Sequence, residues 1–532
     1  MSAINRPRDW FYLAIIIAIA VLLRSPLVPT GITIDDACTA YVVEAGDWPD
    51  LINRIKTIEM SPPLYFLLLK GTTTLFGLTT PVLALTSLVL SVLTIPLIYL
   101  LGRATASARV GLCAAFYAAI SLLAIIYSHE ARTYALAGLL TATTLLLYLP
   151  FFDGKASLPR RLGLGVVSAL LAYTHYTAVA YLGMMTLTAF IYRKNEKSRS
   201  LLAIPPMVAG LATLLPWYPI LKYHSAVGTP WADPTPIVHY LTVLASNTSS
   251  TIPLPVVSSY LLLTLVAPAL FGLAIALKPS ESLAKFRLLC RSPKLSTLAL
   301  LFFYSASAFG FITPYIFGYV RYMYPIACTG WVLMAVITIN VLDRWSAARF
   351  ASAKIKSATA LLLASLAIAA SALEVAGMAR QDRSGLRRLA HDISRSKFEH
   401  AAYITTPDFV GIILVYYLKH ECNIDTAALP DILGFAYPEG GLLPPKHEGR
   451  AACWQDPQLL SKYSGLIDQL KAKGAAQVVL VRDTYTPTSR QIPTRELTDK
   501  LELLLHQKLH QVGETEDYNG HASSYRVTRF AF

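Results

Sequence analysis

The strongest constraint on the fold is a recurring run of about 20 apolar residues, the length that a helix needs to cross the hydrocarbon core of a bilayer. Such runs begin at Trp10 and end near Ala376. Of the 532 residues, 54% are hydrophobic and 15% are charged, whereas soluble domains carry roughly 25% charged residues. The sequence therefore predicts a polytopic α-helical membrane domain over residues 1–376 and a small soluble domain over residues 377–532.

The net charge of +14 belongs to the membrane part of the chain. Residues 1–376 hold 27 Lys and Arg against 14 Asp and Glu, whereas residues 377–532 hold 19 against 18. This distribution fits the rule that cytoplasmic loops carry an excess of Lys and Arg. Because no run of basic residues is interleaved with aromatic ones, we expect no nucleic-acid partner.

Basic clusters between the apolar runs mark cytoplasmic loops and so predict the topology. We expect an integral protein of the cytoplasmic (inner) membrane, with the N-terminus inside and the C-terminal domain on the periplasmic or outer side. About eleven spans are predicted, at 10–29, 81–101, 110–128, 134–151, 161–174, 176–192, 201–220, 254–277, 296–316, 323–342 and 356–376. The hairpin at 161–192 is short for two crossings.

The first outer loop, residues 30–80, holds an apolar segment and a concentration of acids. The apolar segment from Pro62 to Gly77 is short and carries Lys70, so we expect an interfacial helix there. Nine acidic residues lie outside the basic clusters, and six of these lie between Thr30 and Ser61: Asp35, Asp36, Glu44, Asp47, Asp50 and Glu59. Ionisable groups at a membrane boundary are costly and usually functional, so the loop is the first candidate site.

Two interpretations of the acids in this loop remain open. Asp35 and Asp36 follow the first span directly, where one of them could act as a general base or both could cap a helix. Glu59 stands shortly before Pro62 and Pro63, whose rigid geometry would hold it at the interface. There Glu59, together with Asp35, could bind a divalent cation or orient a substrate, or it could be an interfacial acid without a role.

Polar groups also gather at two later outer junctions. His129, Glu130, Arg132 and Tyr134 lie between two apolar spans, where Arg132 could pair with Glu130 or bind a phosphate through its planar fork. His175 and Tyr176 break the short hairpin and could line the same cavity or serve in packing.

Two further basic residues on the outer side have the same ambiguity. Arg321 and Lys222 could each bind an anionic headgroup or a donor phosphate, or could anchor a helix by extending to the interface. No nucleotide-binding motif stands in a usable context, so we expect no nucleotide cofactor.

The soluble domain has the alternating pattern of a small α/β unit. Strands are predicted at 401–406, 476–481 and 525–532, with helices at 409–418 and 494–510. Cys422 and Cys453 could form a disulfide in an oxidising compartment. No catalytic cluster stands out in this domain, so a scaffolding or acceptor-recognition role is expected.

The ordered motifs resemble those of the GT-C glycosyltransferases. They are an acid pair after the first span, an acid shortly before Pro-Pro-Leu-Tyr, the sequence Glu-Ala-Arg-x-Tyr-Ala-Leu, and Thr-His-Tyr. More narrowly, the chain resembles the branch that contains the protein O-mannosyltransferases and the lipid A aminoarabinose transferase. The likeness is clearest over residues 32–192. Relatives often have His or Lys before Pro-Pro, where this chain has Ser61.

The resemblance implies a GT-C-like membrane fold and transfer of a sugar, with inversion, from a polyprenyl-phosphate donor. The acceptor would be a glycolipid, glycan or protein on the outer face. By position, Asp35 would be the base, with Asp36 and Glu59 beside it. Arg132 or Arg321 would supply the phosphate contact that Ser61 cannot. A transporter or flippase of a lipid-linked substrate is the main alternative, and another lipid-linked-glycan enzyme is a second one.

Overall fold

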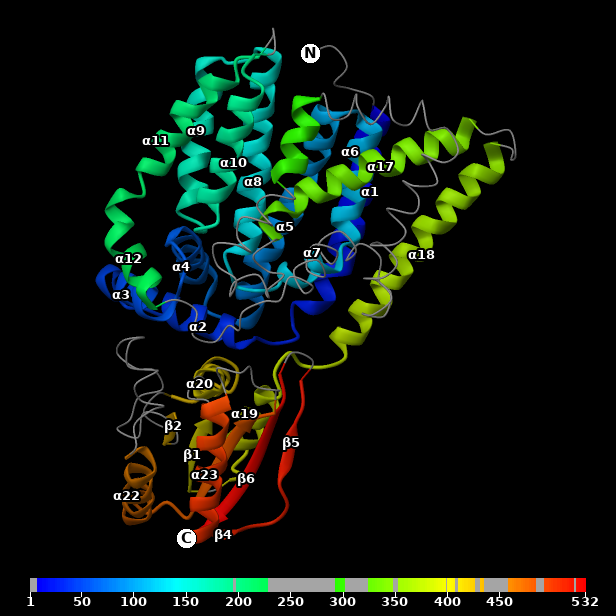
Figure 1. Ribbon diagram of the computed structural model, residues 1–532. Helices are drawn as coiled ribbons and strands as arrows, with labels where there is room; N and C mark the ends of the chain where they lie inside the picture. The colour runs from blue at the N-terminus through cyan, green and yellow to red at the C-terminus, as the bar shows by residue number, and fades with distance from the viewer. Residues whose placement is uncertain are drawn as a thin grey trace.

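A helical bundle and a C-terminal α/β domain make up the computed structural model (Figure 1). The structure describes residues 7–194, 198–227, 292–301, 324–347, 353–398, 400–406, 410–425, 431–434, 458–484, 492–520 and 523–532. The predicted span 254–277, most of the predicted span 296–316, Arg321 and Cys453 lie outside these residues.

The bundle is built from long apolar helices and shorter ones. Its described elements are α1 (Pro7–Arg24), η1 (Ser25–Leu27), α2 (Ile34–Val43), α3 (Trp48–Ile58), α4 (Leu64–Phe76), α5 (Thr80–Thr105), α6 (Ala108–Ile120), α7 (Leu122–Tyr127), α8 (Tyr134–Tyr148), η2 (Leu149–Asp153), α9 (Leu158–Ala172), α10 (Ala178–Ile191), η3 (Ser200–Ala203), α11 (Ile204–Ala212), η4 (Leu215–Trp217), α12 (Tyr218–Val227), α17 (Ala327–Ala347) and α18 (Ala353–Ala379).

Six helical segments of the described residues are long and apolar enough to cross a membrane: Pro7–Leu27, Thr80–Thr105, Tyr134–Asp153, Ser200–Ala226, Tyr324–Asp343 and Ala358–Ala379. All six overlap predicted spans. The bundle also has shorter apolar helices, of which α6 and α10 overlap two further predicted spans. The total of eleven stays a prediction.

The predicted span 110–128 is broken at Ser121, which ends α6 and caps α7. The ψ angle of Ser121 is 119°, outside the helical region, so the carbonyls at the end of α6 lose their intrahelical partners. Arg24 replaces those partners, since its guanidinium donates to the carbonyls of Ala118 and Ala119 at 3.0 and 2.8 Å. The break is therefore stabilised by a side chain from α1.

Loops predicted on one side of the membrane lie together in the structure. Arg109 pairs with Asp343, and Lys294 pairs with Asp153, each at 2.7 Å. The first outer loop lies at the other end of the bundle, where α2, α3 and α4 face the C-terminal domain (Figure 1).

The apolar segment of the first outer loop forms the helix α4, which packs against α2 and α5. Its first amide, of Leu64, donates to the carbonyl of Tyr173 at 2.9 Å and so ties α4 to the end of α9. Lys70 donates to the carbonyls of Val43 and Ala45 just beyond the end of α2. The one basic residue of α4 is therefore used to satisfy the C-terminal end of a neighbouring helix.

The C-terminal domain is a mixed sheet with helices on both faces. Its described elements are α19 (Leu386–Ser394), β1 (Ala401–Thr406), α20 (Val410–His420), β2 (Ile432–Gly434), α22 (Leu459–Ala472), β3 (Gln477–Asp483), α23 (Ile492–Lys508), β4 (His510–Gln511), β5 (Glu516–Tyr518) and β6 (Tyr525–Ala531). The strand order is β2-β1-β3-β6-β4, with β5 also paired to β6. The predicted strands and helices all have counterparts here.

Alternating residues of the central strands fill two cores. Strands β1 and β3 run parallel, with Tyr403 opposite Val479, whereas β6 runs antiparallel to β3. Ile404 and Leu480 pack with α22 and α23, whereas Tyr403 and Val479 pack with α19 and α20. The core that contains Tyr403 and Val479 continues into α2, so the C-terminal domain and the first outer loop share one apolar cluster.

Helix α20 brings the C-terminal domain onto the first outer loop. The hydroxyl of Tyr417 accepts a hydrogen bond from the amide of Ile32 at 2.8 Å. Gly31 has a φ of +97°, and a Cβ there would lie 2.6 Å from that hydroxyl. Cys422, two residues after α20, is a free thiol among the described cysteines, and its Sγ lies 3.6 Å from Nδ1 of His391. Cys453 lies outside the described residues, so the disulfide stays a prediction.

Candidate active site

Asp36 is held by the start of its own helix. Thr33 and Asp36 form a capping box, in which the amide and hydroxyl of Thr33 donate to Oδ2 of Asp36 at 2.8 and 2.9 Å. The other oxygen, Oδ1, accepts from the amide of Ala131 at 2.7 Å. Asp36 is 2% exposed. Of the two interpretations of this acid pair, helix capping describes Asp36.

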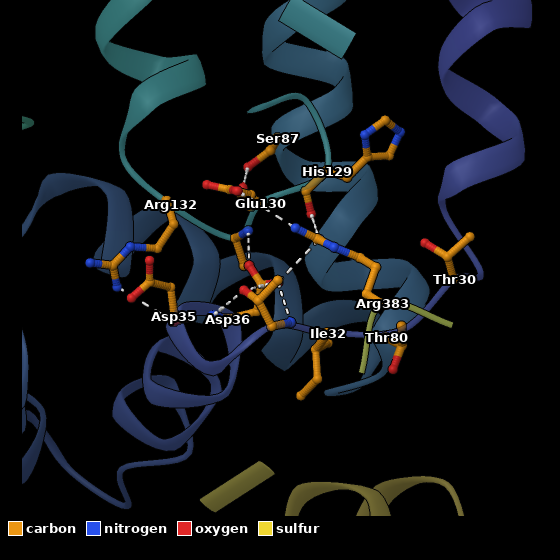
Figure 2. A network of polar contacts seen from close by, with 12 residues as sticks. Thr30, Ile32, Asp35, Asp36, Thr80, Ser87, His129, Glu130, Arg132 and Arg383 are labelled. Atoms are coloured by element: carbon orange, nitrogen blue, oxygen red, sulfur yellow. Dashed lines mark hydrogen bonds and ion pairs between the residues drawn. The ribbon is translucent and has the colours of Figure 1, made fainter. Parts of the chain in front are cut away.

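Arg383, which the sequence analysis did not single out, completes the surroundings of Asp36. Its Nη1 lies 3.2 Å from Oδ2 of Asp36 and donates to the carbonyl of His129 at 3.4 Å, and its Nη2 lies 3.6 Å from Oε1 of Glu130. Figure 2 shows the guanidinium between these two segments. No local pattern distinguishes Arg383 from the other arginines at 380–388, so its partners appear only in the fold.

Asp35 lies outside the capping box, half-buried and beside Arg132 (Figure 2). Nη1 of Arg132 donates to the main-chain carbonyl of Asp35 at 3.4 Å. The two adjacent acids are therefore used differently, because successive residues of a helix point about 100° apart. Asp36 is buried in the structure, whereas Asp35 remains partly exposed.

Glu59 and Arg132 form a buried ion pair, which is the central contact of the site. Nη1 of Arg132 lies 2.6 Å from both carboxylate oxygens of Glu59, and the hydroxyl of Thr39 donates to Oε1 at 3.1 Å. Burial raises the pKa of Glu59, although Arg132 opposes the shift. Burial acts to lower the pKa of Arg132, but Glu59 and Asp35 outweigh it, so the guanidinium stays charged.

Arg132 uses one of its three guanidinium nitrogens in these contacts. Within the described part of the chain, every hydrogen bond of its side chain goes through Nη1, to Asp35, Thr39 and Glu59. The side chain remains 13% exposed. The contacts of Nη1 hold the guanidinium in place. Its other edge, formed by Nη2 and Nε, can therefore donate to two oxygens of an anion.

The divalent cation predicted at Asp35 and Glu59 does not fit this arrangement. Both oxygens of Glu59 face Nη1 of Arg132, so a metal ion bound there would have to displace a buried guanidinium. No group of three His, Cys, Asp or Glu side chains suited to a metal occurs among the described residues.

His129 is turned away from the acids, toward α1 (Figure 2). Its Nε2 lies 2.7 Å from the carbonyl of Arg24, and Nδ1 lies 3.2 Å from the hydroxyl of Ser128. Burial lowers its pKa to about 4, so the ring is neutral. We expected His129 to line the same cavity as Glu130 and His175, but its side chain is instead attached to the end of the first span.

Glu130 does not pair with Arg132, although the sequence left that pairing open. Its carboxylate faces Arg383, and its main-chain carbonyl accepts from the hydroxyl of Ser87 at 2.6 Å. The hydroxyl of Tyr65 lies 2.7 Å from the same Ser87 oxygen. Helices α4 and α5 thus fix the segment that carries Arg132.

Asp35, Asp36, Glu59 and Glu130 are together called the acidic cluster, and His175 lies at its edge, near Arg132. The ring is 6% exposed, lies 5.9 Å from the ring of Tyr134, and accepts through Nδ1 from the amide of Thr177 at 3.2 Å. Burial and the charge of Arg132 lower the pKa of His175 to about 4. A neutral ring with Nδ1 accepting carries its proton on Nε2.

Tyr176 and Lys222 are not joined to the acidic cluster by any contact among the described residues. The hydroxyl of Tyr176 accepts from Nε1 of Trp217 at 3.0 Å and lies 2.9 Å from Nδ1 of His224. Lys222 is exposed on α12.

Comparisons with known proteins agree on the fold. The family model described as dolichyl-phosphate-mannose-protein mannosyltransferase matches residues 60–223. The structure of ArnT from Cupriavidus metallidurans in the apo state matches with a TM-score of 0.58 and 13% identity, covering 98% of both chains. The chain has the GT-C fold.

Two further structures with this fold match the chain. ArnT bound to undecaprenyl phosphate matches with a TM-score of 0.54 and 14% identity, covering 97% of this chain and 98% of the other. The Archaeoglobus fulgidus oligosaccharyltransferase in complex with Zn and sulfate has a TM-score of 0.51 and 14% identity, covering 88% of this chain and 67% of the other. No curated protein matches the sequence. The resemblance to GT-C enzymes is confirmed.

Proposed function

We propose that this GT-C protein transfers a sugar from a polyprenyl-phosphate donor to a hydroxyl acceptor, with Asp35 as the base. The observation that carries the proposal is the arrangement of Asp35 beside Arg132, whose orientation is fixed by Glu59. A solved structure of the same fold is bound to undecaprenyl phosphate. This makes a lipid phosphate the anion class that the fork of Arg132 would bind.

Two features of Asp35 support its proposed role as the base. It is half-buried, and its charge interacts with the guanidinium of Arg132 beside it. Asp36 cannot take this role without breaking the capping box and the contact to Ala131. Glu59 would have to release Arg132.

Arg132 would act on the leaving group. Nη2 and Nε donate to two phosphate oxygens, where negative charge grows as the bond between the anomeric carbon and the phosphate oxygen breaks. The acceptor oxygen attacks the anomeric carbon from the opposite side, and its proton passes to Asp35. The products are an inverted glycoside and polyprenyl phosphate.

The decisive experiment pairs two substitutions in the same loop. Asp35→Asn keeps shape but removes the basic oxygen, so turnover of a polyprenyl-phosphate-linked sugar should fall at least 10³-fold, whereas undecaprenyl phosphate should still bind. Asp50→Asn is the control, because Asp50 lies in α3 and pairs with Arg54. Turnover of Asp35→Asn within tenfold of wild type would exclude Asp35 as the base.

A second pair tests the phosphate contact. Arg132→Gln should weaken binding of undecaprenyl phosphate at least tenfold, as measured by native mass spectrometry or a scintillation assay. Arg54→Gln is the matched control, since Arg54 is a partly buried arginine of the same loop that pairs with Asp50. Equal affinities in both variants would assign the phosphate to other residues, such as Arg321 or Lys222.

The site is proposed to face the periplasm or the outside of the cytoplasmic membrane. The ion pairs of Arg109 with Asp343 and of Lys294 with Asp153 join predicted cytoplasmic clusters at the ends of the helices remote from the site, which supports this orientation under the positive-inside rule (Figure 1). A reporter fused after Phe532 should be active only outside the cytoplasm. A fusion active only inside the cytoplasm would reverse the topology.

A further inference from the structure

Arg383 lies beyond α18 and reaches the four acids of the site, Asp35, Asp36, Glu59 and Glu130, through an ion pair with Asp36 and another with Glu130. Its main chain is held at both ends: its amide donates to the carbonyl of Thr30 at 2.6 Å, and its carbonyl accepts from the amide of Ser523 at 3.1 Å. A Cβ at Gly520 would lie 2.8 Å from that carbonyl, so the packing is close. Contacts with the C-terminal domain therefore fix the position of the Arg383 main chain.

The side chain of Arg383 bridges the two segments that carry the proposed base and the proposed phosphate ligand. It is 8% exposed and reaches Asp36 in one segment and the carbonyl of His129 and the carboxylate of Glu130 in the other. Asp35 precedes Asp36, and Arg132 follows Glu130 by two positions. A shift of either segment would change the distance between Asp35 and Arg132.

Arg383 also balances buried charge. Among the described residues the cluster holds four acids, Asp35, Asp36, Glu59 and Glu130, and two arginines, Arg132 and Arg383. Arg132 is paired with Glu59, so Arg383 is the cation that faces Asp36 and Glu130. A buried carboxylate without such a partner becomes protonated or destabilises the fold.

We propose that Arg383 is a positioning residue for glycosyl transfer, through which the C-terminal domain sets the geometry and the charge of the site in the helical bundle. This inference rests on the proposed function of Asp35 and Arg132. It assigns to the domain a part in the reaction itself, beyond recognition of the acceptor. Without Arg383, the site keeps its residues but loses their relative placement.

Arg387 offers a matched control within the same interface. Its Nε donates to Glu421 at 2.6 Å, and its Nη1 donates to the carbonyl of Pro29 at 2.7 Å and to Asp382 at 3.0 Å. Arg387 therefore joins the C-terminal domain to the start of the loop as Arg383 does, but it touches none of the four acids. A general weakening of the interface should affect both variants alike.

The first measurement is the pH dependence of kcat/KM for the polyprenyl-phosphate-linked sugar. Arg383→Gln should lower kcat/KM about tenfold to hundredfold. It should also move the acidic limb of the profile upward by about one pH unit, because Arg383 balances the charges of Asp36 and Glu130, and without it this negative charge disfavours an ionised base. Arg387→Gln should leave the limb in place. Asp35 interacts electrostatically with Arg132 and Glu59, and Arg383 pairs with the neighbouring Asp36 and with Glu130. His175, on which the charge of Arg132 acts, is neutral.

The second measurement needs no substrate. Hydrogen exchange of the peptide that contains Ala131 should accelerate in Arg383→Gln, because its amide depends on the placement of Asp36. The same peptide should exchange at the wild-type rate in Arg387→Gln. Equal exchange in the two variants would overturn the positioning role, whether or not the protein transfers sugar.

Two outcomes separate this inference from the proposed function. If wild-type protein consumes no polyprenyl-phosphate-linked sugar, the function fails and hydrogen exchange alone decides the role of Arg383. If wild type is active and Arg383→Gln keeps the wild-type acidic limb and rate, the inference fails and the function stands. Should Arg383→Gln not fold, Arg383→Lys retains the charge without the fork, so its limb should stay near wild type while kcat falls.

Discussion

Nη1 of Arg132 and the carboxylate of Glu59, 73 positions apart in the chain, form an ion pair with 2.6 Å to both oxygens in a site where Glu59 is 2% exposed. Burial of two charges is costly, and the cost is offset here by close contact and by the hydroxyl of Thr39. Because the pair uses only Nη1, it orients the guanidinium of Arg132 and leaves Nη2 and Nε available for an anion.

Removing one partner of this pair should destabilise the protein. Glu59→Gln leaves the Arg132 guanidinium buried without its paired charge, and breaking such a pair costs about 3–5 kcal/mol. Asp50→Asn breaks the more exposed pair with Arg54 and should cost less than about 1 kcal/mol. Thermal unfolding in detergent should show a clearly larger fall for Glu59→Gln, and equal falls would contradict the buried pair.

Docking of the C-terminal domain on the first outer loop should depend on Gly31. Gly31→Ala places a Cβ against the hydroxyl of Tyr417 and forces an alanine into a left-handed φ, at a cost of about 1–3 kcal/mol. Gly46→Ala is the control, because a Cβ there meets nothing within 4 Å. Limited proteolysis between α18 and β1 should be faster in Gly31→Ala, whereas unchanged cleavage would argue against tight contact.

Stability should fall as the pH drops from about 6.5 toward 4. Burial holds His129 and His175 neutral with pKa values of about 4, whereas unfolded histidine titrates near 6.5. Between these pH values the histidines bind protons in the unfolded chain but not in the folded protein, so the free energy of unfolding decreases as the pH falls. Above pH 6.5 the histidine contribution is fully present, and below about 4 its loss is complete.

The histidine contribution can be isolated by substitution. Melting temperatures measured from pH 7.5 to 4.5 should fall less steeply for His129→Gln and for His175→Gln than for wild type. Because Glu59 has a raised pKa and acts in the opposite direction, comparison of slopes is more informative than the wild-type curve alone. An identical slope in all three proteins would contradict neutral buried histidines.

Local patterns predicted the helices and strands well where one hydrophobic periodicity continues along the segment. The strands β1, β3 and β6 and the helices α20 and α23 coincide with predicted ranges, because alternation and apolar length are properties of neighbouring residues. The apolar segment from Pro62 to Gly77 likewise indicated the helix α4. The break at Ser121 was missed because it depends on Arg24, whose guanidinium comes from another helix.

The sequence by itself determined that this chain crosses a membrane repeatedly and that its acids are concentrated in one loop beside the first span. Composition and spacing carry that information without reference to distant residues. Only the tertiary structure decided that Asp36 caps a helix while Asp35 faces the site, that Arg132 pairs with Glu59 and not with Glu130, and that His129 points away. Arg383 contacts Asp36 across 347 positions. Such pairings follow from packing, which no local pattern contains.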